Sequence, residues 1–233
     1  MKTSIYSRHR FHPDIIRKTI RLYFRFNLSL RDVEDMMAER GVDVSYETIR
    51  RWVDKFGLTY AKRIKRRAGK PSTVWHLDEV YVRIDGKLAY LWRAVDDEGT
   101  VLDIVVQTRR NRKAALRLIR KLLKNQGVRP ERIVTDRLAS YGAALRDIGL
   151  SGLQDLGGRK NNRAECSHVP IRRRERKAQR FRSIRSAQRV LSAYGQIYNL
   201  FNIRRHLTSR KTMKILRNRA MISWDIATSS CTR

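Results

Sequence analysis

Cysteine is nearly absent from this sequence: Cys166 and Cys231 are the only two among 233 residues. They form neither a disulfide framework nor a zinc-ligand spacing, so we expect a reducing, cytosolic environment. No apolar run approaches the roughly 18 residues that suggest a transmembrane helix. The first ten residues also lack the apolar stretch of a secretory signal peptide. We therefore expect no association with a membrane through a spanning segment.

Acidic residues are also few compared with basic ones. The chain has 53 lysines and arginines against 22 aspartates and glutamates, a formal net charge of +31. Such an excess repels itself unless a polyanion is bound. Nucleic acid is the first candidate partner, because neutralising phosphates releases condensed counterions; an acidic membrane surface is the second. The hydrophobic fraction of 41% is sufficient for a packed core.

Three helices are predicted within residues 1–58. Ser29 and Ser45 are predicted to cap the second and third helices at their N-termini. Gly41 is expected to end the second helix, and Gly57 the third. Two short helices joined by a tight turn, with another helix before them, are typical of a helix-turn-helix DNA-binding domain. An ordinary three-helix packing unit is the alternative interpretation.

The outer face of the third predicted helix carries polar and basic residues. Thr48, Arg50 and Arg51 lie where they could reach base edges or phosphates, or simply form a solvated face. Residues 59–72 then show no apolar periodicity, and we interpret them as a basic linker between two domains. In this linker the side chains expected to contact DNA are Lys62, Arg66 and Arg67.

Residues 73–206 have the pattern of a second domain. Three antiparallel strands are predicted first, joined by turns such as Asp85-Gly86. A helix capped by Asn111 and a strand from Arg132 to Asp136 follow. This is the ribonuclease H-like order, in which the crossover places the fourth strand parallel to the first. The predicted fold is thus mixed α/β, a helix-turn-helix followed by a ribonuclease H-like catalytic domain, with residues 207–233 as a C-terminal tail of no clear pattern.

Two of these strands are expected to end in an acid. The first runs from Thr73 to Asp78, and the fourth ends at Asp136. If the strands are adjacent, the two carboxylates meet at one edge of the sheet, where they could hold a divalent metal. The alternative is that each aspartate merely begins a turn. Glu79 follows the first acid, and strand alternation predicts it on the opposite face as a structural residue.

Three blocks, in order along the chain, resemble the motifs of DDE transposases from bacterial insertion sequences, most closely the IS-six family. They are His76-Leu-Asp-Glu-Val-Tyr81, Thr135-Asp-Arg-Leu-Ala-Ser-Tyr-Gly142 and Asn161-Asn-Arg-Ala-Glu-Cys-Ser-His168. The likeness extends over nearly the whole chain. It implies that Asp78, Asp136 and Glu165 are the catalytic triad and the ligands of two Mg²⁺ ions, for which Mn²⁺ can substitute.

The third acid has a competitor within the same region. Glu165 lies in the matching block, with 28 residues between it and Asp136. Pro170 should kink or restart the helix that follows. Glu175 is the alternative acid, but it sits among arginines, where an ion pair explains it. His168 and His76 are interpreted as packing or phosphate-contacting groups rather than ligands.

A basic run surrounds the proposed third acid. From Arg159 to Arg185 the chain has 11 basic residues and two acids. We interpret this run as the main phosphate-binding surface; a solvated charged face is the alternative. By the resemblance, Arg172, seven positions past Glu165, could grip a phosphate near the metals. The side chains expected to bind DNA here are Arg172, Arg173, Arg174, Arg176 and Lys177.

The resemblance also implies an activity. A DDE transposase binds the ends of its insertion sequence, and cleaves and transfers strands in a metal-dependent reaction; the resemblance implies a replicative reaction with cointegrates as products. The implied partners are double-stranded DNA, both terminal inverted repeats and target, and a second copy of the chain in a synaptic homodimer. The implied location is the bacterial cytoplasm, in association with the nucleoid. The alternatives are a catalytically inactive helix-turn-helix regulator and a ribonuclease H-like nuclease without strand transfer.

Overall fold

A computed structural model describes residues 4–157, 161, 164, 167–177, 181–203 and 207–229. The chain divides into two compact units. One comprises Met1–Ala68 together with Gln196–Arg233, and the other comprises Gly69–Gly195. The boundary between Gly195 and Gln196 falls inside helix α8 (Ile184–Phe201). None of the described helices is both long enough and apolar enough to cross a membrane.

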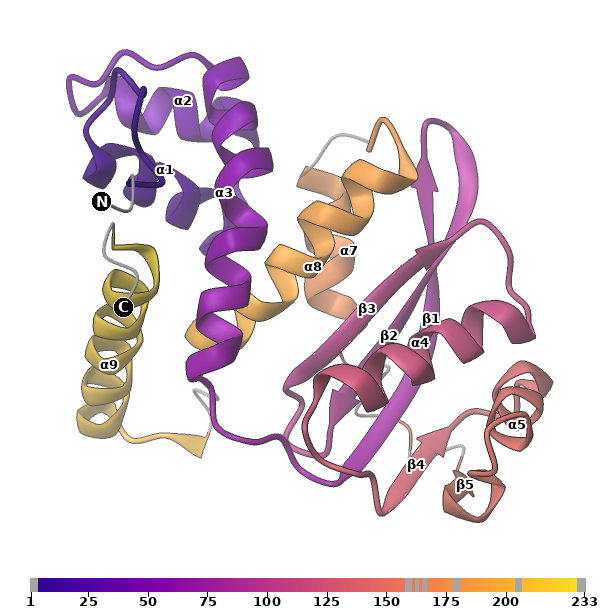
Figure 1. Ribbon diagram of the computed structural model, residues 1–233. Coiled ribbons are helices and arrows are strands. Elements are labelled where there is room, and N and C mark those ends of the chain that lie inside the picture. The colour runs from indigo at the N-terminus through magenta and orange to yellow at the C-terminus, as the bar shows by residue number, and fades with distance from the viewer. Residues whose placement is uncertain are drawn as a thin grey trace. The chain divides into compact units, whose positions relative to one another are not determined.

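The first unit contains the three helices that the sequence predicted for residues 1–58. Its helices are α1 (Pro13–Arg25), α2 (Leu30–Ala38) and α3 (Tyr46–Arg67), drawn in indigo to purple in Figure 1. Ser29 and Asp32 form the reciprocal capping box of α2, with N···O distances of 3.0 and 2.9 Å. Gly41, at a φ of +70°, follows α2, and Ser45 caps α3. The predicted caps of α2 and α3 and the glycine between the two helices are confirmed.

Helix α3 is longer than the sequence pattern indicated. The expectation that it ends at Gly57 is wrong, because the helix continues to Arg67. Phe56, Tyr60 and Ile64 are all buried and continue the apolar stripe at intervals of four residues. Most of the segment interpreted as an irregular basic linker is therefore helical, and its basic residues as far as Arg67 lie on this one long helix.

The C-terminal residues form a further helix, α9 (Arg210–Thr228), where the sequence showed no clear pattern. Its Trp224 packs edge-on against Tyr60 of α3, with ring centroids 5.5 Å apart. The Tyr6 hydroxyl lies 2.5 Å from that of Tyr60 and donates to the carbonyl of Thr228 at 2.5 Å. These contacts make α9 part of the core of the first unit.

The second unit is built on a five-stranded mixed sheet of order β3-β2-β1-β4-β5. The strands are β1 (Val74–Ile84), β2 (Lys87–Asp96), β3 (Val101–Gln107), β4 (Arg132–Thr135) and β5 (Gln154–Leu156). Strands β1, β2 and β3 are antiparallel, whereas β4 and β5 run parallel to β1. This is the ribonuclease H-like arrangement, so the predicted fold class is confirmed. Strand β5 was not predicted.

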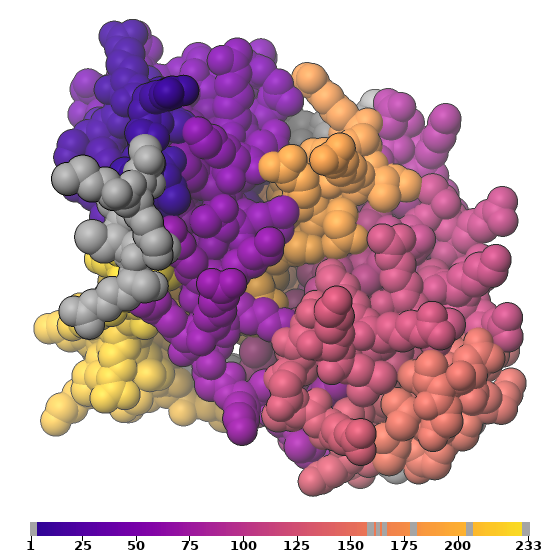
Figure 2. Space-filling model, in the orientation of Figure 1, coloured from indigo at the N-terminus to yellow at the C-terminus, as the bar shows by residue number. Residues whose placement is uncertain are grey.

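Helices cover both faces of this sheet (Figure 1). On one face α4 (Arg112–Asn125) and α5 (Ala139–Arg146) enclose a core that includes Trp75, Leu77 and Trp92. Figure 2 shows a closed surface of side chains over this face. On the other face lie α7 (His168–Lys177) and the first part of α8, whose Gln188 bonds to the backbone of Ile104 and Val106 on β3.

Candidate active site

Strands β1 and β4 bring the first two predicted acids together. The parallel pairing of these strands ends at Leu77 and Thr135, so Asp78 and Asp136 are the next residues on each side. The expectation that Asp78 ends its strand is wrong, because β1 continues to Ile84 in pairing with β2. Asp78 therefore lies at the point where the pairing of β1 with β4 stops and only its pairing with β2 continues. It is buried, at 8% exposed, while the Asp136 side chain is 38% exposed.

Glu79 joins these two aspartates in the structure. One carboxylate oxygen from each of Asp78, Glu79 and Asp136 lies within 4.8 Å of the other two, close enough to share an ion. Alternation along β1 does direct Glu79 to the face covered by α5, where the Tyr141 hydroxyl donates to its Oε2 at 3.0 Å. The sequence interpretation nevertheless missed its closeness to the aspartates. The only signal was its position beside Asp78, where the β4 pairing stops.

Arg110, in the connection between β3 and α4, contacts this acidic group. Its Nε and Nη2 lie 2.7 and 2.5 Å from Oε1 of Glu79, and its Nη2 is 4.0 Å from Oδ2 of Asp136. The hydrogen bond to Glu79 raises the pKa of the guanidinium. The Glu79 side chain is only 4% exposed, whereas that of Arg110 is 45% exposed. Both carboxylate oxygens of Glu79 are thus engaged by protein groups, and the arginine extends to the surface beside Asp136.

His168, the first residue of α7, faces Asp78 from the other side of the sheet. Its Nε2 is 3.5 Å from Oδ2 of Asp78, and its side chain is 17% exposed. Burial, followed by the nearby charges of Arg93 and Arg172, lowers the pKa of His168 to about 4. The imidazole is therefore neutral at pH 7 and presents no positive charge to Asp78. Pro170 lies in the first turn of α7, where proline is tolerated, as the predicted restart of the helix requires.

Glu165, the third acid implied by the resemblance, lies outside the described residues. Two described residues near it in sequence are tied to the region around Asp78. Asn161, which is 1% exposed, donates from Nδ2 to the Leu77 carbonyl at 3.1 Å. Arg93, the pairing partner of Asp78 on β2, donates to the Ser167 carbonyl.

Glu175, the alternative third acid, is engaged elsewhere. Its Oε1 accepts a hydrogen bond from the backbone N–H of Arg83 at 2.9 Å, and its Oε2 one from Arg172 at 3.2 Å. It does not belong to the described group of acids that could share an ion. Arg172 also donates to the Tyr81 carbonyl and lies over the Tyr81 ring, 4.2 Å from its centroid.

The predicted DNA-contacting residues differ in their exposure. On α3, Thr48 and Arg50 are half-buried, and Arg50 pairs with Glu47 one turn earlier. Arg172 of α7 is also half-buried, whereas Arg174 is fully buried and does not present its guanidinium to solvent. The prediction that Arg174 belongs to the phosphate-binding surface is therefore wrong, because this residue lies on the inward face of α7. The exposed members of the set are Arg51, Lys62, Arg66 and Arg67 on α3 and Arg173, Arg176 and Lys177 on α7.

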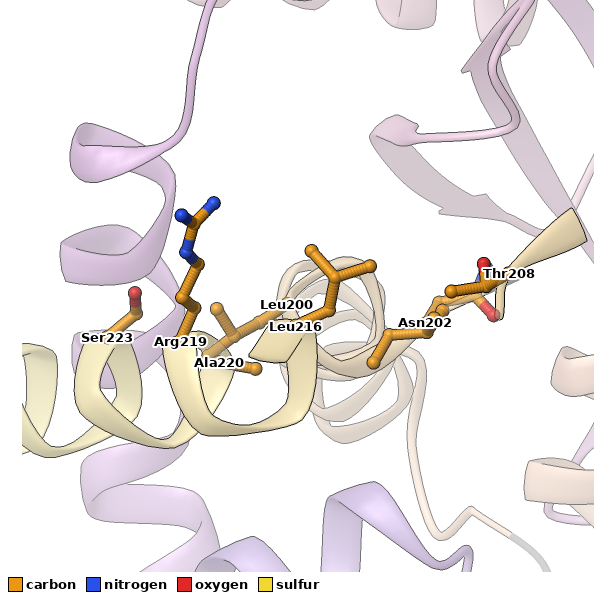
Figure 3. A pocket seen from close by; sticks show the side chains of 8 residues that line it. Leu200, Asn202, Thr208, Leu216, Arg219, Ala220 and Ser223 are labelled. Carbon is orange, nitrogen blue, oxygen red and sulfur yellow. The ribbon is translucent and has the colours of Figure 1, made fainter. Parts of the chain in front are cut away.

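A shallow pocket of about 380 Å³ lies in the first unit, between the end of α8 and α9. Figure 3 shows its lining side chains spread along α9 from Ser223 to Leu216, and on to Asn202 and Thr208. The lining combines leucines with hydroxyl, amide and guanidinium groups and contains no acid, histidine or cysteine among the described residues. It therefore offers no ligands for the metal-dependent chemistry that the acids of the second unit suggest.

Comparison with known proteins gives consistent matches. A family model described as a DDE domain matches residues 72–204. The transposase for insertion sequence-like element IS431mec of Staphylococcus aureus strain Mu50 is 32% identical over 197 residues, covering 82% of this chain and 86% of the relative. The transposase for insertion sequence element IS257 in transposon Tn4003, also of Staphylococcus aureus, is 31% identical with the same coverage.

Among solved structures, the simian T-cell lymphotropic virus intasome in complex with PP2A regulatory subunit B56 gamma matches with a TM-score of 0.44 and 13% identity. The match covers 92% of this chain and 74% of that chain. The fold assignment rests instead on strand order and register. The matched DDE domain and the relatives, which cover most of the chain, decide the family: this chain belongs to the DDE transposases of bacterial insertion sequences, within the IS-six family.

Proposed function

We propose that this chain binds the ends of its own insertion sequence, cleaves DNA strands there and joins them to target DNA. The observation that carries the proposal is the placement of Asp78 and Asp136. They follow directly the last pair of the parallel β1–β4 ladder, in a chain of the DDE family. Two carboxylates at one edge of a ribonuclease H-like sheet are suited to phosphodiester chemistry that depends on divalent metal.

The donor atoms fit Mg²⁺, because the aspartates present only hard carboxylate oxygens, which this ion prefers. Asp78 and Asp136, with Glu165 as the third acid, would hold two Mg²⁺ ions, and Mn²⁺ could replace them. Bound there, the ions would activate the attacking water or 3′-hydroxyl and stabilise the leaving oxygen. The closeness of Asp78 and Asp136 within the described acid group supports such a site, whereas Glu79, the third member of that group, bonds to Arg110 and Tyr141.

The protein groups around Asp78 keep its carboxylate in one orientation. The backbone N–H of Glu79 donates to Oδ1 at 2.9 Å, and His168 lies beside Oδ2. Because the lowered pKa leaves the imidazole uncharged at pH 7, it adds no positive charge that would repel a metal cation from the carboxylate. Because these contacts orient the carboxylate before DNA binds, no further ordering of this side chain is needed when DNA binds.

Basic side chains on both units would bind the DNA. On α3, Arg51, Lys62, Arg66 and Arg67 are exposed, and we assign this helix to the terminal inverted repeats. Arg50 and Thr48 belong to the same reading surface, Arg50 once it exchanges Glu47 for a base or phosphate. On α7, Arg173, Arg176 and Lys177 are exposed and suited to phosphates near the acids, with Arg172 partly exposed beside them.

Further features of the proposal come from the family. Both ends of an insertion sequence must be handled together, so a homodimer is expected in the synaptic complex. Replicative transposition with cointegrate products is expected, in the bacterial cytoplasm on nucleoid DNA.

A strand-transfer assay with labelled insertion-sequence ends tests the proposal. The wild type should cleave and join in Mg²⁺ or Mn²⁺, and Asp78→Asn, Asp136→Asn and Glu165→Gln should each abolish both steps while retaining end binding. Asp97→Asn, in the exposed turn between β2 and β3, is the matched control and should be fully active. Cleavage without joining would indicate a nuclease, and specific binding without cleavage would indicate a regulator; either result overturns the transposase assignment.

A further inference from the structure

Glu79 is the acid beside Asp78 that the metal-ion chemistry of the proposed function does not require. Its side chain is 4% exposed, and a buried carboxylate is costly unless it is paired and hydrogen-bonded. Both of its oxygens have partners: Oε1 accepts from Nε and Nη2 of Arg110, and Oε2 accepts from the hydroxyl of Tyr141. A carboxylate engaged on both oxygens is suited to holding an arginine rather than to binding a metal.

Tyr141 strengthens this arrangement from α5. The ring is fully buried and packs edge-on against Trp92 of β2, with centroids 5.4 Å apart. Burial, then the charge of Glu79, raises the pKa of Tyr141 well above its usual value. The hydroxyl therefore keeps its proton and donates a hydrogen bond to Oε2 of Glu79. The backbone of β1 and the buried ring of Tyr141 together fix where the Glu79 carboxylate lies.

Arg110 is the exposed member of this set. Its guanidinium has five N–H donors, and the contacts to Glu79 engage only the side formed by Nε and Nη2. The same guanidinium approaches Asp136 to 4.0 Å, so it lies at the rim of the acid group with 45% of its side chain exposed. Arginine in such a place binds phosphate through its planar set of donors.

We propose that Arg110 is a catalytic residue that contacts the scissile phosphate beside Asp136, held in position by Glu79 and Tyr141. This inference rests on the proposed function, since it assigns a further role at the same site. The guanidinium supplies positive charge next to the non-bridging oxygens, on which negative charge increases as the phosphorus is attacked. Glu79 and Tyr141 are positioning residues that act through Arg110.

The first test compares joining rates in single turnovers at saturating DNA. Arg110→Ala should slow joining by about 10²-fold, the usual effect of removing one such charge-stabilising donor. Arg110→Lys should lose less, and free guanidinium ion should partly restore Arg110→Ala. The joining rate of Glu79→Gln should lie between those of wild type and Arg110→Ala, and Tyr141→Phe should have the smallest effect.

Arg109→Ala is the matched control, because the neighbouring Arg109 is exposed and has no ion pair or hydrogen bond with another described residue. Its rate should equal that of wild type.

The second test measures binding and does not depend on catalysis. The probe is a duplex with the terminal inverted repeat, carrying either a normal phosphate or an uncharged methylphosphonate at the junction with flanking DNA, in Ca²⁺. Wild type and Arg109→Ala should prefer the phosphate, and Arg110→Ala should lose most of that preference.

Equal preference in wild type and Arg110→Ala would overturn the inference, even in a protein that transposes normally. Faster joining or tighter Mn²⁺ binding by Arg110→Ala would also overturn it, because the guanidinium would then compete with metal. If wild type fails to join DNA yet Arg110→Ala loses the preference, the proposed function fails and the phosphate contact stands.

Discussion

Arg172 holds the carboxylate of Glu175, donating from Nη1 to Oε2 at 3.2 Å within one turn of α7. The other oxygen of Glu175 accepts the backbone N–H of Arg83. With both oxygens engaged in this way, Glu175 serves to join α7 to β1. This geometry favours Glu165 as the third catalytic acid, in agreement with the motif block in which it lies.

Glu165→Gln and Glu175→Gln should therefore behave differently. We expect Glu165→Gln to lose joining of labelled ends completely. Glu175→Gln should retain joining and lower the free energy of unfolding by about 0.5–1.5 kcal/mol, since it weakens two hydrogen bonds. The joining assay and a denaturant titration measure the two effects. Normal joining by Glu165→Gln together with loss in Glu175→Gln would reverse the assignment.

The sheet could be predicted from the sequence because its signals are local. Alternating apolar residues, the Asp85-Gly86 turn and the Asn111 cap each act within a few residues, and the handedness of the crossover places β4 beside β1. The closeness of Glu79 to Asp136 could not be predicted in this way. It depends on where the β1–β4 pairing stops and on Arg110 and Tyr141, which come from distant parts of the chain.

Long helices with many basic residues were harder to predict. In α3 the buried Tyr60 and Ile64 are separated by lysine and arginine, so the segment has low mean hydropathy although its inner stripe is intact. In α9 the buried residues are few, and Trp224 is the largest. Such helices are stabilised by tertiary packing on one narrow face, which is a weak signal in the sequence.

The two neighbouring arginines of α3 should contribute unequally to end recognition. Arg51 is exposed, whereas Arg50 pairs with Glu47. We expect Arg51→Ala to weaken binding to the terminal inverted repeat by about 1–3 kcal/mol, and Arg50→Ala to weaken it less, because Arg50 must first give up its ion pair. Fluorescence anisotropy and footprinting measure both effects. Arg120→Ala, exposed on α4, is the control; protection of the ends that persists in both α3 variants would show that another element reads the DNA.

His168 should make the stability of the metal-free protein depend on pH. Its pKa is lowered from 6.5 to about 4 in the folded state, chiefly by burial, so the unfolded chain binds more protons between these values. The contribution of His168 to the free energy of unfolding is therefore fully present above about pH 6.5 and is lost as pH falls toward 4, by up to about 3 kcal/mol.

Urea titrations at several pH values should show this loss, and His168→Gln should reduce it. A measurement at pH 8, where histidine is neutral in both states, isolates the packing cost of the substitution. An unchanged pH dependence in His168→Gln would contradict the prediction.

Helix α9 should be required for the stability of the first unit. Trp224 is 1% exposed and packs against Tyr60 and Phe201, with ring centroids 5.5 and 6.0 Å away. Trp224→Ala should therefore cost about 3–5 kcal/mol, the usual loss for a large buried aromatic residue. Ile222→Ala, on the same helix with 51% exposure, should cost less than about 0.5 kcal/mol. Chemical denaturation of both variants measures the difference. Equal stability of the two would mean that α9 does not pack on α3 in solution, and that residues 207–233 are the separate tail that the sequence pattern first suggested.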